Sequence, residues 1–213
     1  MKIYLVFVIL LILNDVSYAQ CSSVPRSHAR LQWSETAKLV SPDRGWELEV
    51  RPLLTSDENQ SPVRLRSCQG TGSRTLLTLQ GSAEAYWGPD SKSLLIINEP
   101  VANSNKLLFL RTTSVKGSVE EEASGQIDEA VRQRLSQELG EKRHIEFYLP
   151  QFVSWKASGL VLAVGGATSS GADGPMSPYC YGFLIDPGSR EVRGVLSEQS
   201  LKAKFGKECR ISP

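Results

Sequence analysis

The sequence has few of the residue patterns that build metal or nucleotide sites. It contains only two histidines, His28 and His144, and no CxxC pair among its four cysteines, so the ligand spacing of a structural zinc site is missing. It also has no GxxxxGK[ST] phosphate loop and no GxSxG nucleophile elbow. Asp173 beside Gly174 is a single carboxylate where calcium needs six to eight oxygens. We therefore expect no metal ion and no cofactor.

The chain also has almost no net charge. Its 24 Lys and Arg residues are balanced by 23 Asp and Glu residues, which leaves a formal charge of +1. A nucleic-acid or acidic-lipid partner would normally require a clear basic excess. We accordingly expect no nucleic-acid partner.

Only one long apolar run is present, and it lies at the N-terminus. Lys2 precedes the uninterrupted apolar residues 3–13, a run that is short for a membrane span. Ser17 and Ala19 then supply the small residues that a signal peptidase recognises. We predict a signal peptide over residues 1–19 with cleavage between Ala19 and Gln20, and therefore a periplasmic or extracellular protein with no stable membrane insertion after cleavage. The alternatives are an uncleaved membrane anchor and a lipid anchor on Cys21, which follows Gln20.

All four cysteines lie in the exported part of the chain. An oxidising compartment favours two disulfides over free thiols, and four cysteines allow three pairings. We favour Cys180 with Cys209, which would tie the C-terminal tail to the last hairpin, and Cys21 with Cys68, which would fasten the N-terminus.

A strand, turn and strand pattern recurs along the chain. The segments VSPDRGWELEV (residues 40–50) and YWGPDSKSLLII (residues 86–97) both place Pro-Asp between apolar strand residues, and 47 positions separate Asp43 from Asp90. A degenerate third copy is FVSWKASGLVLAV (residues 152–164). Proline and aspartate suit such turns because proline presets φ and the aspartate side chain bonds the backbone ahead. A fixed period of this size indicates repeated supersecondary units.

The second half of each unit also repeats, as a strand, a glycine-containing turn and another strand. The segments are VRLRSCQGTGSRTLLTL, KLLFLRTTSVKGSV and YGFLIDPGSREVRGVL. We therefore predict an all-β, antiparallel fold of about three four-stranded units, near residues 30–81, 82–119 and 145–200, in a single domain over 20–213.

One helix is expected to interrupt the repeats. Residues 124–140 place Ile127, Val131, Leu135 and Leu139 four apart on one face, which is helical spacing. Ser124 is the expected N-cap and Gly140 the expected terminator. We predict a helix near 126–139 within an inserted segment 120–144, with a solvated polar face or, as the alternative, a partner-binding one.

The Pro-Asp turns and the hairpins together resemble the blade repeats of TolB-type β-propellers, relatives of the WD-repeat proteins. The resemblance covers most of residues 30–200 apart from the helix. It implies an open or partial propeller, because closed propellers have four to eight blades and this chain shows three. It also implies an exported, non-catalytic binding or scaffold module of the bacterial envelope that acts through protein contacts. A structural envelope protein that acts by self-association is a further alternative.

The remaining question is whether any residues could be catalytic. The alternative function is a secreted hydrolase with a site in the loops around Ser169, Ser170 and Asp173 together with His144; for that, the four side chains must converge in one pocket. We interpret residues 165–174, which hold the first three, as a long flexible loop. Trp87 and Trp155 occupy equivalent repeat positions, so we predict that both lie in the core. The sequence leaves Trp33 and Trp46 open.

Overall fold

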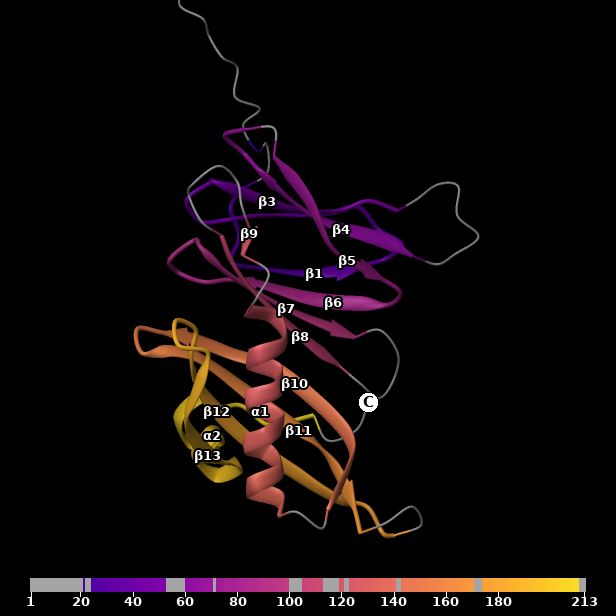
Figure 1. Ribbon diagram of the computed structural model, residues 1–213, viewed down its shortest axis with the longest axis vertical. Helices are drawn as coiled ribbons and strands as arrows, with labels where there is room; N and C mark the ends of the chain where they lie inside the picture. The colour runs from indigo at the N-terminus through magenta and orange to yellow at the C-terminus, as the bar shows by residue number, and fades with distance from the viewer. Residues whose placement is uncertain are drawn as a thin grey trace, which may run out of the picture.

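The computed structural model describes residues 21, 24–52, 60–70, 72–99, 105–112, 119–120, 123–140, 143–170 and 174–210. Ala19 and Gln20, and with them the expected signal-peptide cleavage site, lie outside the described residues. The described strands form three separate antiparallel sheets, stacked along the long axis of the molecule (Figure 1). The prediction of an all-β, antiparallel fold of about three sheets that do not close into a barrel, with a helix inserted before the last sheet, is confirmed.

The three sheets follow the chain order almost without crossovers. The first sheet has the order β2-β3-β4-β5, the middle sheet β1-β6-β7-β8-β9 and the third sheet β10-β11-β12-β13. The strand bounds of the first sheet are β2 Ala37–Val40, β3 Trp46–Val50, β4 Ser61–Ser67 and β5 Ser73–Leu79. Those of the middle sheet are β1 His28–Gln32, β6 Ser82–Trp87, β7 Ser93–Glu99, β8 Lys106–Thr112 and β9 Val119–Glu120. Those of the third sheet are β10 His144–Lys156, β11 Gly159–Ser169, β12 Ser177–Asp186 and β13 Glu191–Ser197.

Strand β1 differs from the sequence prediction. The first predicted unit includes residues 30–32, yet β1 pairs with β6 of the middle sheet, with Ala29 opposite Ala85. Period-2 alternation specifies which side chains of a strand are buried, but it does not specify the neighbouring strand. The middle sheet consequently has five strands where four were expected.

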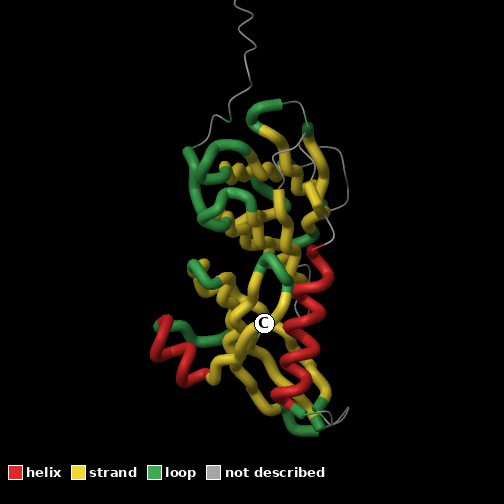
Figure 2. Tube along the Cα trace, turned by 60° about the vertical axis from the view of Figure 1, so that its left-hand side comes forward, coloured by secondary structure: helices red, strands yellow, loops and turns green. Residues whose placement is uncertain are grey.

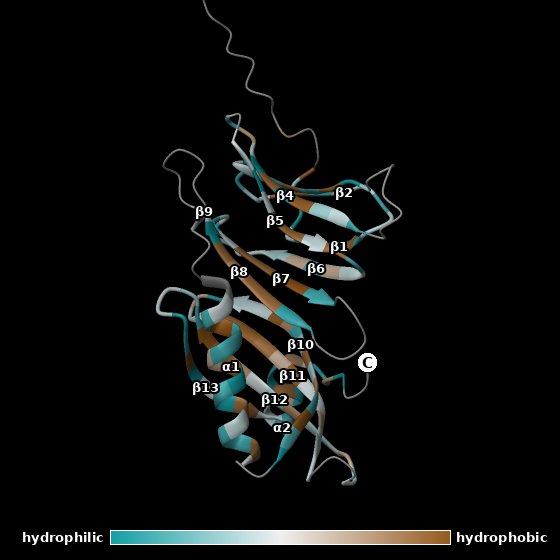
Figure 3. Cartoon of the chain, turned by 45° about the vertical axis from the view of Figure 1, so that its right-hand side comes forward, coloured by the Kyte–Doolittle hydropathy of each residue, from teal (hydrophilic) through white to brown (hydrophobic). Residues whose placement is uncertain are grey.

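The middle sheet is buried on both faces. In β7 the fully buried Leu94 and Ile96 belong to the core shared with the first sheet, whereas Leu95 and Ile97 belong to the core shared with the third sheet. Strands buried on both faces carry continuous apolar runs in place of alternation, which explains the sequence LLII. Figure 3 shows this hydrophobic colouring along β7 and β8.

The two Pro-Asp turns have the same backbone geometry. Ser41 N donates to Trp46 O at 2.9 Å, and 47 residues later Gly88 N donates to Ser93 O at 2.7 Å. Both turns place a non-glycine residue in the left-handed region, Arg44 at φ 58° and Ser91 at φ 57°. The turn between β10 and β11 is different: it ends at Gly159 with φ 135°, where a Cβ would stand 2.1 Å from the Ile185 carbonyl oxygen. Only the first two copies therefore retain the Pro-Asp turn.

The predicted helix is present as α1, Ala123–Leu139. Ile127, Val131 and Leu135 are fully buried in the core between the middle and third sheets. Gly140 has φ 84° and donates its N–H to Ser136 O at 3.0 Å, as expected for a terminator. The N-cap prediction is wrong, because the helix begins before Ser124.

A second helix, α2 Glu198–Phe205, was not predicted. Ser197 caps its N-terminus, Gly206 ends it at φ 61°, and the buried Leu201 packs on the third sheet with Ala163 and Cys180. The two helices lie on opposite sides of the third sheet (Figure 2). Within the described part of the chain, no helix is long and apolar enough to cross a bilayer.

Two disulfides close the ends of the fold in the pairing that the sequence favoured. Cys21 bonds Cys68, and Cys180 bonds Cys209. The second bond holds the C-terminal segment on β11, where a Cβ on Gly165 would stand 1.9 Å from the Arg210 carbonyl oxygen. Glycine is therefore required at that position for the tail to approach.

Candidate binding cleft

The residues of the hydrolase hypothesis lie at one end of the third sheet. His144 and Ser169 are cross-strand partners of β10 and β11, and Ser170 is exposed directly after β11. Asp173 lies outside the described residues. Ser169 is only 4% exposed, and its hydroxyl donates to Glu146, not to His144. A serine nucleophile needs open access to substrate as well as an adjacent base, and the buried Ser169 lacks that access.

The loop prediction for residues 165–174 is wrong over its first half. Residues 165–169 belong to β11, which continues to Ser169. Gly166 has φ 154°, and a Cβ there would stand 2.0 Å from the Phe147 carbonyl oxygen. Glycines usually indicate loops, but here they permit close backbone and side-chain approach within a buried strand.

A cleft of about 410 Å³ opens where turns of the middle and third sheets converge. Its wall combines the β6–β7 turn, the end of β8, the β10–β11 turn and the β12–β13 turn. Loops that project from rigid sheets are the usual position of binding residues. We call this site the turn-end cleft.

Two aspartates in the cleft wall hold the turns in shape. Asp90 accepts hydrogen bonds from the N–H groups of Lys92 and Ser93 at 3.0 and 2.9 Å and from the Ser93 hydroxyl at 2.9 Å. Asp186 accepts from Gly188 N at 2.7 Å and is ion-paired with Arg193. Both carboxylates are thus committed to the protein itself.

Two cations of the cleft wall, Arg111 and Lys156, make no ion pair with the described residues, although the Arg111 charge does lower the pKa of Asp90. Arg111 is exposed at the end of β8 and makes no hydrogen bond or ion pair with the described residues. Lys156 is exposed at the end of β10; within the described part of the chain it makes no hydrogen bond or ion pair, and its Nζ lies 5.3 Å from the centroid of the Phe205 ring. Their charges can therefore be directed to a bound group.

Trp155 forms the aromatic part of the cleft wall. It is half-buried, with ring centroids 6.2 Å from Phe152 and 6.4 Å from Phe109. Its indole Nε1 is buried and has no hydrogen-bond partner among the described residues. The part of Trp155 that lines the cleft therefore supplies aromatic surface.

The other tryptophans serve packing. Trp87 is 1% exposed and Trp46 is 9% exposed, both in the core between the first and middle sheets, and the half-buried Trp33 packs against the same core. The core prediction is thus confirmed for Trp87. Part of the Trp155 side chain packs against the core between the middle and third sheets, and another part lines the cleft.

The hydrogen bonds of Asp90 lead to a prediction about how its contribution to stability depends on pH. Partial burial opposes ionisation of Asp90, but the N–H groups of Ser93 and Lys92, the Ser93 hydroxyl and the Arg111 charge outweigh it, so the pKa of Asp90 lies below its ordinary value of 3.8. A depressed pKa contributes stability that is present above pH 3.8 and is lost as the pH falls through the folded-state pKa. We expect Asp90→Asn to lower the free energy of unfolding by about 1 kcal/mol at pH 7 and by less at pH 3. Urea unfolding at the two pH values measures this, with the exposed Glu35→Gln as control. An equal loss at both pH values would contradict the prediction.

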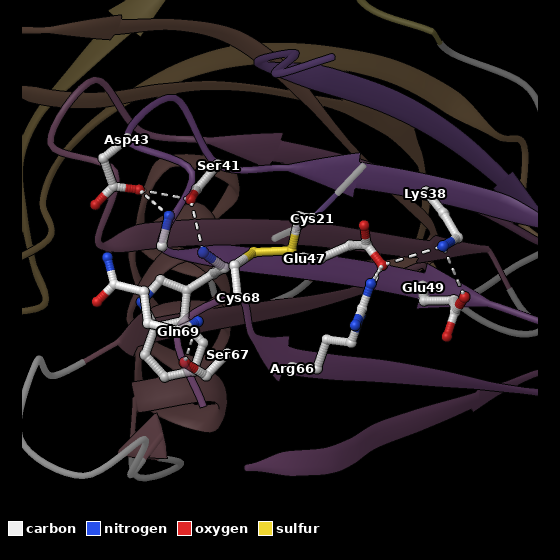
Figure 4. Close-up of a disulfide and its surroundings, with 12 residues drawn as sticks. Cys21, Lys38, Ser41, Asp43, Glu47, Glu49, Arg66, Ser67, Cys68 and Gln69 are labelled. Atoms are coloured by element: carbon white, nitrogen blue, oxygen red, sulfur yellow. Dashed lines mark hydrogen bonds and ion pairs between the residues drawn. A yellow bond between two sulfur atoms is a disulfide. The ribbon is translucent and has the colours of Figure 1, made fainter. Parts of the chain in front are cut away.

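A second polar cluster lies on the outer face of the first sheet (Figure 4). The fully buried Glu47 pairs with Arg66 at 2.7 Å and with Lys38 at 3.4 Å, and Lys38 also reaches Glu49 at 3.4 Å. One Glu47 oxygen, Oε2, has no partner among the described residues. The neighbouring cations already neutralise the carboxylates, and the described residues contain no group of three or more metal-ligating side chains. The cluster is thus an ion-pair network within the sheet.

A smaller cleft of about 330 Å³ lies beside α1 and β8. Asp128 accepts from the Tyr148 hydroxyl at 2.9 Å, and Arg132 lies 3.6 Å above the Tyr148 ring. Burial, together with the Asp128 charge, holds the pKa of Tyr148 well above its ordinary value. These groups partner one another, which fastens α1 to β10.

Comparison with known protein families, curated proteins and solved structures gave no match. The candidate site therefore depends on the geometry alone. Sequence analysis did not identify Arg111 or Lys156, because each is an ordinary surface cation in its own strand and acquires its role only where distant turns meet.

Proposed function

We propose that this chain is an exported, non-catalytic binding module that holds a partner protein at the turn-end cleft. The observation that carries the proposal is the pair of exposed cations, Arg111 and Lys156, that lines the cleft beside the Trp155 ring. Fixed donors on rigid sheets are what a recognition surface requires. The resemblance to TolB-type propeller repeats supports the same role in the bacterial envelope.

Export is part of the proposal. Two disulfides, together with the expected signal peptide, favour a periplasmic or extracellular location, because disulfides persist in oxidising compartments. The cleft opens between two sheets that share one core, so a partner would meet a preformed surface. Preformed sites lose less conformational entropy on binding.

Self-association through free sheet edges is less well supported than partner binding. The edge strand β5 carries a β-bulge and places Arg74 opposite the buried Leu65. The edge strand β10 carries two register shifts and Pro150. Bulges, charged residues and proline at edges oppose strand pairing. Both strands therefore have features that protect a sheet edge from another copy.

Affinity capture tests the proposed function. The mature chain with intact disulfides serves as bait in the exported fraction of the source cells, and captured proteins are quantified by mass spectrometry. We expect Arg111→Ala with Lys156→Ala to reduce capture of a specific partner about tenfold, which corresponds to about 1.4 kcal/mol. The matched control is Arg30→Ala with Lys204→Ala, which removes the same charge from exposed positions outside the cleft. Equal capture by both double variants would overturn the proposal.

A further inference from the structure

We infer that the turn-end cleft binds a carboxylate in an acidic segment of a partner protein. The inference rests on the proposed function and names the chemistry of its ligand. Around the cleft, the charged side chains without a hydrogen bond or ion pair to the described residues are both cations, Arg111 and Lys156, and the exposed Ser158 hydroxyl also has no partner among these residues. The acceptors, Asp90 and Asp186, are occupied by turn N–H groups and by Arg193. A group that completes such a site must supply acceptors and negative charge.

The geometry of the donors favours a carboxylate. An arginine guanidinium forms two parallel hydrogen bonds with a carboxylate, and such charge-assisted pairs are stronger than neutral ones. The Lys156 ammonium is a second, mobile charge on the same wall.

The rest of the wall favours a peptide over a free inorganic anion. Pro89, Pro187 and the Trp155 ring border the donors with apolar surface, which contacts carbon atoms and not a hydrated ion. Among the described residues that line the cleft, two cations have no ion pair, and both are exposed to solvent, whereas phosphate sites combine several cations or backbone N–H groups. A side-chain carboxylate carried on a peptide satisfies both the donors and the apolar border.

Nuclear magnetic resonance of the indole N–H groups tests the inference directly. The mature protein has four tryptophans, and Trp155→Phe assigns the Trp155 signal by its loss. The probe is the capped peptide acetyl-Gly-Leu-Glu-Asp-Leu-amide, and the matched peptide replaces Glu and Asp by Gln and Asn. We expect the acidic peptide to shift the Trp155 signal saturably and the neutral peptide to bind at least about tenfold more weakly. The signals of Trp46 and Trp87 should not move, because both side chains are buried in the other core.

Variants and salt separate a specific pair from general attraction. Arg111→Ala should weaken binding of the acidic peptide about tenfold, and Arg111→Lys, which keeps the charge but not the fork, by an intermediate factor. Lys204→Ala, which removes an exposed charge on α2 outside the cleft, should leave the affinity unchanged. Raising the ionic strength should weaken binding, because both cations are exposed.

Three outcomes would overturn the inference. They are equal binding of the acidic and neutral peptides, no shift of the Trp155 signal, and an equal shift with inorganic phosphate alone, which would identify a simple anion site. The proposed function fails separately: if captured partners still depend on Arg111 and Lys156 while the acidic peptide does not bind, the binding module stands and only its ligand chemistry is wrong.

Discussion

Replacing Ile97 with alanine is expected to lower the free energy of unfolding by about 2–5 kcal/mol, the range for truncating a buried isoleucine. Ile97 is 1% exposed and lies in the core between the middle and third sheets. Urea unfolding followed by far-ultraviolet circular dichroism and by tryptophan fluorescence measures the loss. The exposed Val24→Ala, at a residue that is 74% exposed, is the control and should change stability by less than about 0.5 kcal/mol.

Ile96→Ala is the matched variant on the opposite face of the same strand. Ile96 is fully buried in the core between the first and middle sheets. Because β7 belongs to both cores, we expect both variants to shift one common transition. Two separate transitions in Ile97→Ala would contradict a shared middle sheet. In that case the fluorescence of Trp46 and Trp87, in the core between the first and middle sheets, would keep its wild-type midpoint, while circular dichroism would show a second transition at lower urea concentration.

Removing the Cys21–Cys68 bond with Cys21→Ser and Cys68→Ser is expected to lower the free energy of unfolding by about 4 kcal/mol. The two cysteines are 47 residues apart, and cross-linking a long segment removes much of the entropy of the unfolded chain. The bond also covers Val40 on the outer face of the first sheet. Thermal and urea unfolding under oxidising conditions measure the loss.

The other disulfide supplies the comparison for that experiment. Cys180 and Cys209 are 29 residues apart, so Cys180→Ser with Cys209→Ser should lower the free energy of unfolding by slightly less, about 3.5 kcal/mol on the same entropy argument. Reduction of the wild-type protein should reproduce the combined effect. A loss below about 1 kcal/mol for the Cys21–Cys68 variant would show that the N-terminus is held by other contacts.

A local feature was predictable when the residues that produce it lie in one short segment of the sequence. The Pro-Asp turns follow from proline, aspartate and adjacent strand residues, and the helix follows from Ile127, Val131 and Leu135 at helical spacing. Helix α2 also carried local signals, a capping Ser197 and a terminating Gly206, but eight residues give too short a pattern to stand out. Residues 165–169 were misinterpreted because the reason for their glycines, contact with Arg210 and Phe147, lies elsewhere in the chain.

By itself, the sequence determined the antiparallel hairpins and the helix around Val131, since each follows from neighbouring residues; it left three disulfide pairings open, of which the structure has the favoured one. Only the tertiary structure decided that β1 joins the middle sheet and that turns around Asp90, Trp155 and Asp186 meet beside Arg111. The physical reason is that side-chain alternation specifies which face of a strand must be buried, but not which other face covers it. The candidate cleft exists because the middle and third sheets pack on each other, which strand alternation alone does not specify.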